Sequence, residues 1–353
     1  MIPVTKSFLP PIEEYQTLIQ KLWKSGWLTN RGVMVKELEQ RINAYLGTKH
    51  MIAMTNGTLP LQIAIKALNL QGEIITTPFS YVATTSSIVW EGCTPVFVDI
   101  DPEYLTIDET KIEAAITKKT TAILATHVYG NPCNVDAIES IAKKYDLKVI
   151  YDAAHCFGVQ YKGQSIFNYG DVSTCSFHAT KVFHTGEGGA AFCNDEALYK
   201  DMYYHHNFGH SGPESFYNVG INAKMSELQA AMGLSVLPYM NRIIEQRRII
   251  VDNYDKLIDG KVKFAFNKRK GLEWNYAYYP ILFDSEEILL KSMKQLNEIG
   301  VFPRRYFNPS LNQLPYVKAV KCEISETLTK LVLCLPLYPE LDGNIQKNIV
   351  NNL

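Results

Sequence analysis

Short apolar runs alternate with amphipathic segments between about residue 50 and residue 195, and this pattern restricts the fold more than any other feature. Strands that are buried on both faces read as continuous apolar runs, whereas a surface helix carries one apolar stripe. Alternation of the two predicts an α/β fold with a mostly parallel, helix-covered sheet. The predicted strands are HMIAMT, EIITTP, PVFVDID, TAILATH, KVIYDAA, DVSTCSF and GGAAFC.

The segments between these runs predict helices, and the order of the elements predicts where a ligand binds. In open α/β sheets, ligands bind beyond the carboxyl ends of the strands. Residues 55–58, 152–155 and 177–181 follow three predicted strands, so we expect them to converge on one crevice. The predicted helical stripes are Leu61, Ala64, Ile65 and Leu68 in the first helix and Ile138, Ile141, Ala142 and Tyr145 in the second.

The character of the chain changes after a long helical stretch that Pro238 is expected to kink or break. From about residue 260, segments such as NYAYYPILF and SEEILLKSMKQLNEIG indicate a smaller α+β unit. We therefore predict a large domain of residues 14–240 and a small C-terminal domain of residues 241–353. The N-terminal segment 1–13 is expected to join the small domain.

Composition narrows the kinds of ligand. The chain has 35 basic and 36 acidic residues, so it lacks the basic excess of a protein that binds nucleic acid or an anionic membrane. It has no apolar run of membrane-spanning length and no signal-peptide pattern, which predicts a cytoplasmic protein. The seven cysteines are scattered without a C-x-x-C pair and predict neither a disulfide framework nor a zinc site. A small-molecule ligand, and no metal, is expected.

Lys181 stands between an apolar run that ends at Phe177 and a glycine-dense turn at residues 186–189. Lysines usually lie on solvated surfaces, so this position is unusual for one. The turn does not match G-x-G-x-x-G and leads into a strand rather than a helix, which excludes a dinucleotide fingerprint. Gly188 and Gly189 are expected to let the backbone pass close to a ligand.

Asn56, Gly57 and Thr58 follow a predicted strand and open a predicted helix. Free N–H groups and the positive end of the helix dipole would lie there, and both favour a bound anion. An ordinary helix N-cap explains the same residues. Pro60 removes one donor and leaves the N–H groups of Gly57, Thr58 and Leu59 for a phosphate.

Asp152 ends an apolar strand and is followed closely by His155. A carboxylate at the edge of a core costs desolvation energy unless a cation or hydrogen-bond donors meet it. The pair is either a capping Asp with a satisfied core His, or an Asp facing a pyridinium N–H with a His touching the adjacent phenolic oxygen. Ser176 could bind a phosphate, and Phe79 or Tyr81 could stack on a cofactor ring or lie in the core.

Taken together, the chain resembles the DegT/DnrJ/EryC1/StrS family of pyridoxal-phosphate sugar aminotransferases over nearly its whole length. The order and spacing of the motifs make this resemblance specific. It implies the aspartate-aminotransferase fold, which is fold type I of enzymes that use pyridoxal 5'-phosphate (PLP). The motifs are SGWLTNRG, TNGTLPLQIAIKAL, TTPFSYVATTSSIVWEGCTPVFVDID, THVYGNPCNVD, YDAAHCFG, SFHATKVFHTGEGG, GINAKMSELQAA and GVFPRRYFNPSLNQLPY.

The resemblance implies a role for each candidate residue. Lys181 forms the Schiff base with PLP, Asp152 keeps the pyridine nitrogen protonated and His155 contacts the ring oxygen. Tyr81 stacks on the ring, and the phosphate is held by Gly57, Thr58 and Ser176 of one subunit with Asn222 of another, which implies a homodimer with shared sites. Many relatives follow this asparagine with Tyr-Arg, where this chain has Ala-Lys. The substrate-binding residues implied are Thr29, Arg304, Arg305 and Tyr306.

Within the family, the sequence is most similar to the VioA-type members. These aminate dTDP-4-keto-6-deoxyglucose to dTDP-4-amino-4,6-dideoxyglucose, with L-glutamate as donor, and imply ping-pong kinetics and a place in amino-sugar biosynthesis for the O-antigen of lipopolysaccharide. Aminotransferases for 3-keto-6-deoxyhexoses are the alternative. A non-catalytic or regulatory protein of the same fold is the other class, but no basic helix-turn-helix segment supports it. Lys181 argues against the sugar dehydratases of this fold, which carry His there.

Overall fold

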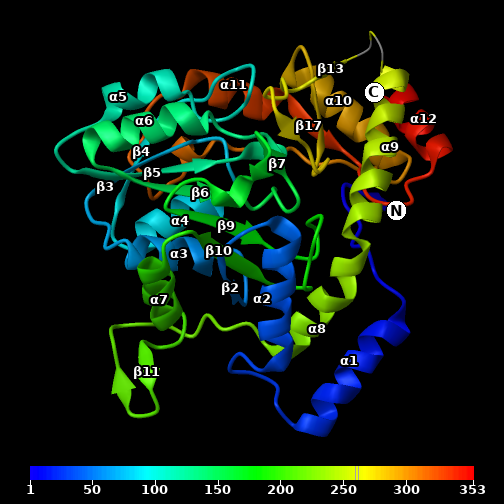
Figure 1. Ribbon diagram of the computed structural model, residues 1–353. Helices are drawn as coiled ribbons and strands as arrows, with labels where there is room; N and C mark the ends of the chain where they lie inside the picture. Colours follow the sequence, from blue (N-terminus) through cyan, green and yellow to red (C-terminus); the bar gives the residue numbers. More distant parts are fainter. Residues whose placement is uncertain (259, 261) are drawn as a thin grey trace.

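A computed structural model describes residues 1–258, 260 and 262–353, and its centre is one mixed sheet (Figure 1). Six of its strands run in the same direction, and β10 alone is antiparallel to both of its neighbours. The α/β fold with a mostly parallel sheet is therefore confirmed. In spatial order the strands are β2 (His50–Met54), β10 (Gly189–Cys193), β9 (Val172–Ser176), β6 (Lys148–Asp152), β5 (Thr120–Thr126), β3 (Glu73–Thr76) and β4 (Thr94–Phe97).

Helices cover both faces of this sheet, so most of the side chains in its inner strands are buried. Along β2, Met51 and Ala53 belong to one core cluster, whereas Ile52 and Met54 belong to another. The first cluster includes side chains of α2 and α6, and the second includes side chains of α3, α4 and α7. The helices that cover the sheet are α2 (Val33–Leu46), α3 (Leu59–Ala67), α4 (Val82–Trp90), α6 (Val135–Tyr145) and α7 (Glu196–His205).

The helical stripes expected from the sequence are buried, with two exceptions. Leu68 is only half-buried and caps the carboxyl end of α3, and Tyr145 is exposed in the last turn of α6. Tyr145 instead donates a hydrogen bond to Glu113 on the surface. A tyrosine keeps its polar tip in water when a partner lies there.

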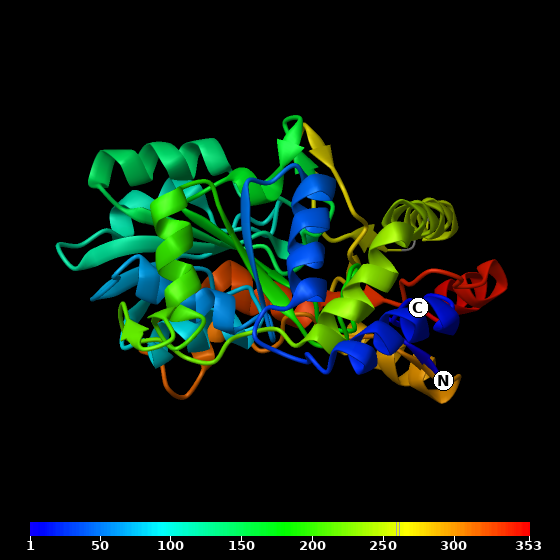
Figure 2. The same ribbon diagram turned by 60° about the horizontal axis from the view of Figure 1, so that its bottom comes forward.

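The chain leaves the large sheet through two helices separated by a short 3-10 turn, Leu237–Tyr239, at the expected break around Pro238. The C-terminal elements then pack beside the sheet. Both chain ends lie on the same side of the molecule as these elements (Figures 1 and 2). A three-stranded antiparallel sheet consists of β13 (Lys263–Phe264), β15 (Tyr279–Leu282) and β17 (Val332–Leu335). The helices are α8 (Glu227–Val236), α9 (Met240–Ile258), α10 (Glu286–Glu298), α11 (Glu323–Leu331) and α12 (Gly343–Asn351).

The N-terminal segment contacts these C-terminal elements. Strand β1 (Ile2–Pro3) pairs in parallel with β16 (Val301–Phe302), and the Leu337 N–H donates to the Val4 carbonyl. The boundaries of the two predicted domains stay a prediction. The remaining elements are α1 (Ile12–Ser25), α5 (Ile112–Ala115), β7 (Gln160–Tyr161), β8 (Gln164–Ser165), β11 (His210–Gly212), β12 (Ser215–Phe216) and β14 (Leu272–Glu273).

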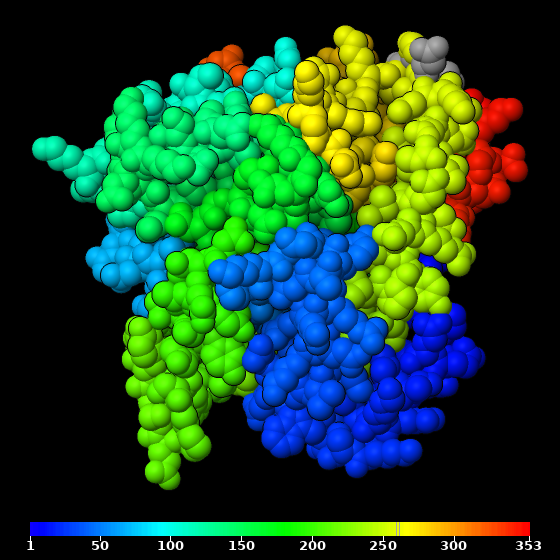
Figure 3. Space-filling model, in the orientation of Figure 1, coloured from blue at the N-terminus to red at the C-terminus, as the bar shows by residue number. Residues whose placement is uncertain are grey.

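The hairpin formed by β11 and β12 projects from the body of the molecule, as the space-filling view shows at the lower left (Figure 3). Several apolar side chains on and around it are exposed. No helix in the described ranges combines the length and the apolar character that a bilayer crossing needs. All seven cysteines are buried free thiols, as the sequence predicted.

Candidate active site

A cavity of about 300 Å³ opens beyond the carboxyl ends of the parallel strands, where the sequence predicted a ligand. It is lined from the turns after β2, β3, β6 and β9 and from the C-terminal part of the chain. Register brings these turns together, because Thr126, Asp152 and Thr174 are paired across β5, β6 and β9. The predicted site residues that line it are Gly57, Thr58, Tyr81, Asp152, His155, Ser176, Lys181 and Tyr306.

Lys181 lies in the turn that joins β9 to β10. Backbone hydrogen bonds fix this turn, among them Lys181 N–H to His178 and Thr185 N–H to Phe177. The Lys181 Nζ lies 3.4 Å from the hydroxyl of Tyr278, to which it donates. Burial lowers the pKa of the Lys181 ammonium, and the negative charge of Asp152 opposes that shift. A lysine in this setting is more readily a neutral nucleophile than one on the surface.

Asp152 is a buried carboxylate at the end of β6. It accepts hydrogen bonds from the Thr84 hydroxyl at 2.6 Å and from the Ala154 N–H at 3.1 Å. Burial raises the pKa of the Asp152 carboxyl, and these donors act in the opposite direction. None of the ion pairs among the described residues includes Asp152. A cationic N–H group in the cavity would supply the missing partner.

His155 is a neutral imidazole with one defined tautomer. Its Nδ1 lies 3.1 Å from the backbone N–H of Tyr129, which can only donate. Nδ1 therefore accepts, so the proton of the neutral ring is on Nε2. Burial, followed by the charge of Lys181, holds the pKa of His155 well below its usual value. His155 can thus donate one hydrogen bond to an oxygen in the cavity.

The opposite end of the cavity is a close-packed contact between Gly57 and Ser176. A Cβ on Gly57 would lie 2.7 Å from the Ser176 Cβ and 2.9 Å from its Oγ, so only glycine fits. The N–H groups of Thr58 and Leu59 already donate to the Asn56 side chain, at 2.9 and 3.0 Å. The predicted set of free donors is therefore smaller: the Gly57 N–H and the hydroxyls of Thr58 and Ser176 remain for an anion.

The two aromatic candidates after β3, Phe79 and Tyr81, differ in their exposure to solvent. Phe79 is fully buried and packs edge-on against Tyr129 and Phe307. Tyr81 is 61% exposed at the mouth of the cavity. The expectation that Gly188 and Gly189 pass close to a ligand stays a prediction. Both are tightly packed in the protein, since a Cβ on Gly189 would lie 2.3 Å from the Asn56 carbonyl oxygen and one on Gly188 would lie 2.0 Å from the Thr185 Oγ1. Gly189 allows β10 to pack against the loop after β2.

A second, larger cavity of about 970 Å³ continues from the first and shares Tyr81 and Tyr306 with it. Arg304 and Arg305 both line it, but they differ in their partners. The Arg305 side chain donates to Glu286 at 2.6 Å and is 17% exposed, whereas Arg304 is exposed and forms none of the ion pairs found among the described residues. Arg304 is the cation free to meet a ligand.

Thr29 and Asn222 line neither cavity of the chain. Both are exposed, and their neighbours Asn30, Asn207 and Lys224 line a separate hollow of about 670 Å³ beside the projecting hairpin. Their predicted roles in substrate and phosphate binding stay predictions.

Sequence reasoning missed Thr84 and Tyr278, which contact Asp152 and Lys181. Thr84 lies in α4, whose sequence VATTSSIVW places hydroxyl residues at buried positions where apolar ones are usual. That excess of hydroxyls in a buried helix was the available signal. No signal in the sequence distinguished Tyr278, because it is one aromatic residue among several in NYAYYPILF.

The donor set fits PLP. A half-buried lysine with a lowered pKa can join an aldehyde, a buried carboxylate without a cation can meet a pyridinium N–H, and a neutral His155 can donate to a phenolic oxygen. Gly57 and Ser176 form a cradle that a side chain on Gly57 would fill. Each group of the cofactor thus has a matching partner.

Comparison with known proteins agrees with this geometry. The model of the DegT/DnrJ/EryC1/StrS aminotransferase family matches residues 11–353. The chain belongs to this family. A dTDP-4-amino-4,6-dideoxy-D-glucose transaminase of Shigella dysenteriae is 40% identical over 99% of this chain and 97% of its own length. The DegT-family chain described here is therefore a PLP-dependent sugar aminotransferase.

Two solved structures support the fold and the cofactor of this DegT-family aminotransferase. DesI, crystallised in the presence of its TDP-sugar product, has a TM-score of 0.94 at 32% identity over 99% of this chain and 91% of its own. The PLP form of Spr1654 from Streptococcus pneumoniae has a TM-score of 0.90 at 25% identity, covering 99% of this chain and 97% of its own.

Proposed function

We propose that the protein transfers an amino group from L-glutamate to a nucleotide-linked 4-keto-6-deoxyhexose, with dTDP-4-keto-6-deoxyglucose as substrate and dTDP-4-amino-4,6-dideoxyglucose as product. One observation carries this proposal. The Lys181 cavity opens through Tyr81 and Tyr306 into a cavity of about 970 Å³ that holds a free arginine. The first can hold PLP, and the second has room and charge for a nucleotide diphosphate.

The residues of the first cavity match the needs of amino transfer. When bound, PLP supplies an aldehyde that takes up the amino group and a ring that withdraws electrons from the bond being broken. Asp152 holds a proton on the ring nitrogen, and His155 Nε2–H orients the ring oxygen. Lys181 would hold the cofactor through its amine and, as a free amine, would carry a proton between the amino-bearing carbon and the cofactor. The Gly57 N–H and the Thr58 and Ser176 hydroxyls hold the phosphate.

Arg304 is the residue that we assign to the substrate diphosphate. Its guanidinium is exposed to the larger cavity, and planar N–H groups suit phosphate oxygens. Arg305 has a different task, because its ion pair with Glu286 holds the same loop against α10. Tyr306 lines both cavities and would lie between the sugar and the cofactor.

We infer that the active enzyme is a homodimer whose sites are shared, with Asn222 completing the phosphate site and Thr29 contacting substrate across the interface. Exposed apolar side chains around the projecting hairpin support this inference, since large exposed apolar patches mark interaction surfaces. They are Phe208, Phe216, Tyr217, Val219 and Ile221. We place the reaction in the cytoplasm, whose reducing conditions suit seven buried free thiols, and its product in O-antigen biosynthesis.

A panel of nucleotide keto sugars tests the proposed substrate. Each is incubated with the PLP-loaded enzyme and L-glutamate, and the product is identified by NMR. We expect an equatorial or axial amine at C4 of the dTDP-linked sugar as the main product. Amination only of 3-keto sugars would instead assign the enzyme to the 3-keto branch. Release of 2-oxoglutarate with no aminated sugar from any member would contradict a sugar substrate.

A further inference from the structure

Three buried hydroxyl groups form a line of hydrogen bonds that ends on Asp152. The Thr126 hydroxyl donates to Ser80 at 2.9 Å, Ser80 and Thr84 lie 2.7 Å apart, and Thr84 donates to the Asp152 Oδ2 at 2.6 Å. We call Thr126, Ser80 and Thr84 the hydroxyl chain. At most 3% of each of these residues is exposed.

The hydroxyl chain crosses several elements of the large sheet. Thr126 ends β5 and is paired with Asp152 at the end of β6, Ser80 lies in the loop after β3, and Thr84 is in the first turn of α4. Its members are thus held by separate elements of the sheet and its helices, so their spacing is fixed by the fold rather than by local sequence.

The direction of every hydrogen bond in the chain follows from the charge on Asp152. A hydroxyl has one hydrogen, and an ionised carboxylate can only accept. The Thr84 hydrogen is therefore committed to Asp152, which leaves Ser80 as the donor to Thr84 and Thr126 as the donor to Ser80. Hydroxyls aligned in one direction polarise one another and strengthen the last bond.

A neutral Asp152 would weaken this arrangement. The hydrogen bond that Thr84 donates is stronger to an ionised carboxylate than to a neutral carboxylic acid, so protonation of Asp152 gives up part of that bond. Burial favours that neutral form and raises the pKa of Asp152, and the hydrogen bond from Thr84 is the largest influence against it. The hydroxyl chain therefore acts on the charge state of Asp152 as well as on its position.

We propose that the hydroxyl chain keeps Asp152 ionised and thereby keeps the proton on the ring nitrogen of bound PLP. This inference rests on the proposed function, in which Asp152 faces that nitrogen. The proton between the Asp152 carboxylate and the ring nitrogen stays on the stronger base of the two. Each hydrogen bond donated to the carboxylate makes it a weaker base, so the proton stays on the ring nitrogen. Thr84 is thus a positioning residue that acts through Asp152.

The neighbouring residue Thr85 offers a matched control. It lies in the same helix, is fully buried, and its hydroxyl has no hydrogen-bond partner among the described residues. Thr84→Val and Thr85→Val replace the same side chain by the same isostere one position apart. Only the first removes a donor to Asp152. Thr84→Ser keeps that donor, and Ser80→Ala cuts the chain one step further away.

The experiment follows the absorbance of the lysine-bound cofactor against pH, together with the dissociation constant of PLP from the reconstituted apo-protein. A protonated ring lowers the pKa of the nearby lysine-bound nitrogen, so loss of the ring proton raises the midpoint of this titration. For Thr84→Val we expect a midpoint higher by about one unit and a kcat lower by about ten- to a hundred-fold, as for a lost hydrogen bond to a charged group, with little change in KM.

The other variants separate this role from packing. Thr84→Ser and Thr85→Val should titrate as the unaltered enzyme does, and Ser80→Ala should shift the midpoint in the same direction by less. A Thr84→Val midpoint equal to that of Thr85→Val, or an equal shift in Thr84→Ser, would overturn the proposal. If Thr84→Val does not fold, Ser80→Ala decides in the same way. Failure of the unaltered protein to bind PLP through Lys181 would instead overturn the proposed function.

Discussion

Asp152 is buried and Lys181 is half-buried, and loss of contact with water disfavours the charged form of each. It lowers the pKa of the lysine and raises that of the aspartic acid, while their mutual attraction opposes both shifts. The sequence identified both residues through their positions after apolar strands. It did not predict their surroundings, because Thr84 and Tyr278 reach them from elements that are distant in the sequence.

The lowered pKa of Lys181 has a consequence for the apo-protein. Only the neutral amine attacks an aldehyde, and burial increases its fraction below the ordinary lysine pKa. We therefore predict that the rate of PLP capture rises with pH and reaches its plateau below about pH 10.5. By the same sign, the folded apo-protein loses stability as the pH falls from the ordinary lysine pKa towards the lowered pKa of Lys181, because in that range the unfolded chain binds the proton and the folded chain does not. Stopped-flow absorbance measures the rate, and a continued rise up to the pKa of an exposed lysine would contradict this prediction.

Arg304 and Arg305 should respond differently to removal. We predict that Arg304→Ala raises KM for the nucleotide sugar by about tenfold, equivalent to about 1.4 kcal/mol, because a phosphate contact is lost. The half-reaction with glutamate should stay near normal, because glutamate carries no diphosphate. Arg305→Ala is the control, because it leaves Glu286 without its partner. This variant should lower the melting temperature, and it should raise KM for the nucleotide sugar less than Arg304→Ala does. Equal effects of Arg304→Ala on both half-reactions would show that the diphosphate is held elsewhere.

The strands of the large sheet were predictable because a buried strand is an apolar run of characteristic length, and each of the predicted runs overlaps one observed strand. The direction of β10 in the sheet was not predictable, because an apolar run carries no information on strand direction. The β9–β10 connection is a turn rather than a helical crossover, which makes that pair antiparallel. Short strands such as β13 and β14, of two residues each, lie below the length at which alternation is visible.

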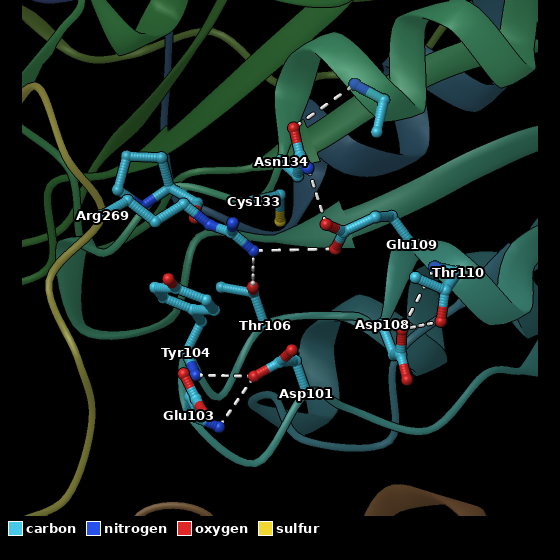
Figure 4. Close-up of polar contacts among 12 residues, drawn as sticks. Asp101, Glu103, Tyr104, Thr106, Asp108, Glu109, Thr110, Cys133, Asn134 and Arg269 are labelled. Atoms are coloured by element: carbon cyan, nitrogen blue, oxygen red, sulfur yellow. Dashed lines mark hydrogen bonds and ion pairs between the residues drawn. The ribbon is translucent and has the colours of Figure 1, made fainter.

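One polar cluster joins the segment between β13 and β14 to the large sheet, and it was invisible in the sequence. Figure 4 shows the Arg269 guanidinium between Glu109 and Tyr104. It lies 3.6 Å from the Glu109 carboxylate and 4.0 Å above the Tyr104 ring, and its Nε donates to the Pro132 carbonyl at 2.8 Å. Only 11% of the Arg269 side chain is exposed. The cluster fixes this segment against the loops after β4 and β5.

We predict that Arg269→Ala lowers the free energy of unfolding by about 3 kcal/mol, because it leaves the half-buried Glu109, whose Oε2 is shielded from solvent, without a cation. Arg248→Ala is the matched control, since Arg248 forms two ion pairs at 2.6 Å on the exposed face of α9. Exposed pairs are worth about 1 kcal/mol or less, so this variant should be near neutral. Urea unfolding of both variants provides the measurement. Equal losses would show that the Arg269 cluster is no more than a surface contact.

The arrangement of the chain leaves two predicted residues, Thr29 and Asn222, outside the two cavities of the candidate site. Both lie near the projecting hairpin with its exposed aromatic side chains. The sequence supplied these residues through the family resemblance, but nothing in its periodicity could indicate which subunit they serve. The proposed shared site would account for their exposed positions.

Subunit mixing tests this sharing. We predict that Lys181→Ala and Asn222→Ala homodimers are each impaired, and that mixed dimers regain activity. In a mixed dimer, one site has both lesions and the other has neither. With random exchange about half of the dimers are mixed, and each contributes one intact site. Mass spectrometry of differently tagged subunits would verify exchange, and an absence of recovery after verified exchange would count against a shared site.

Single-turnover spectroscopy of the two half-reactions tests the proposed amino transfer most directly. L-Glutamate alone should bleach the absorbance of the lysine-bound cofactor and release one equivalent of 2-oxoglutarate per site. After the glutamate is removed, dTDP-4-keto-6-deoxyglucose should restore the absorbance and yield one equivalent of the 4-amino sugar, while Lys181→Ala should do neither. Bleaching by glutamate that the keto sugar fails to reverse, or restored absorbance without an aminated sugar, would contradict the account.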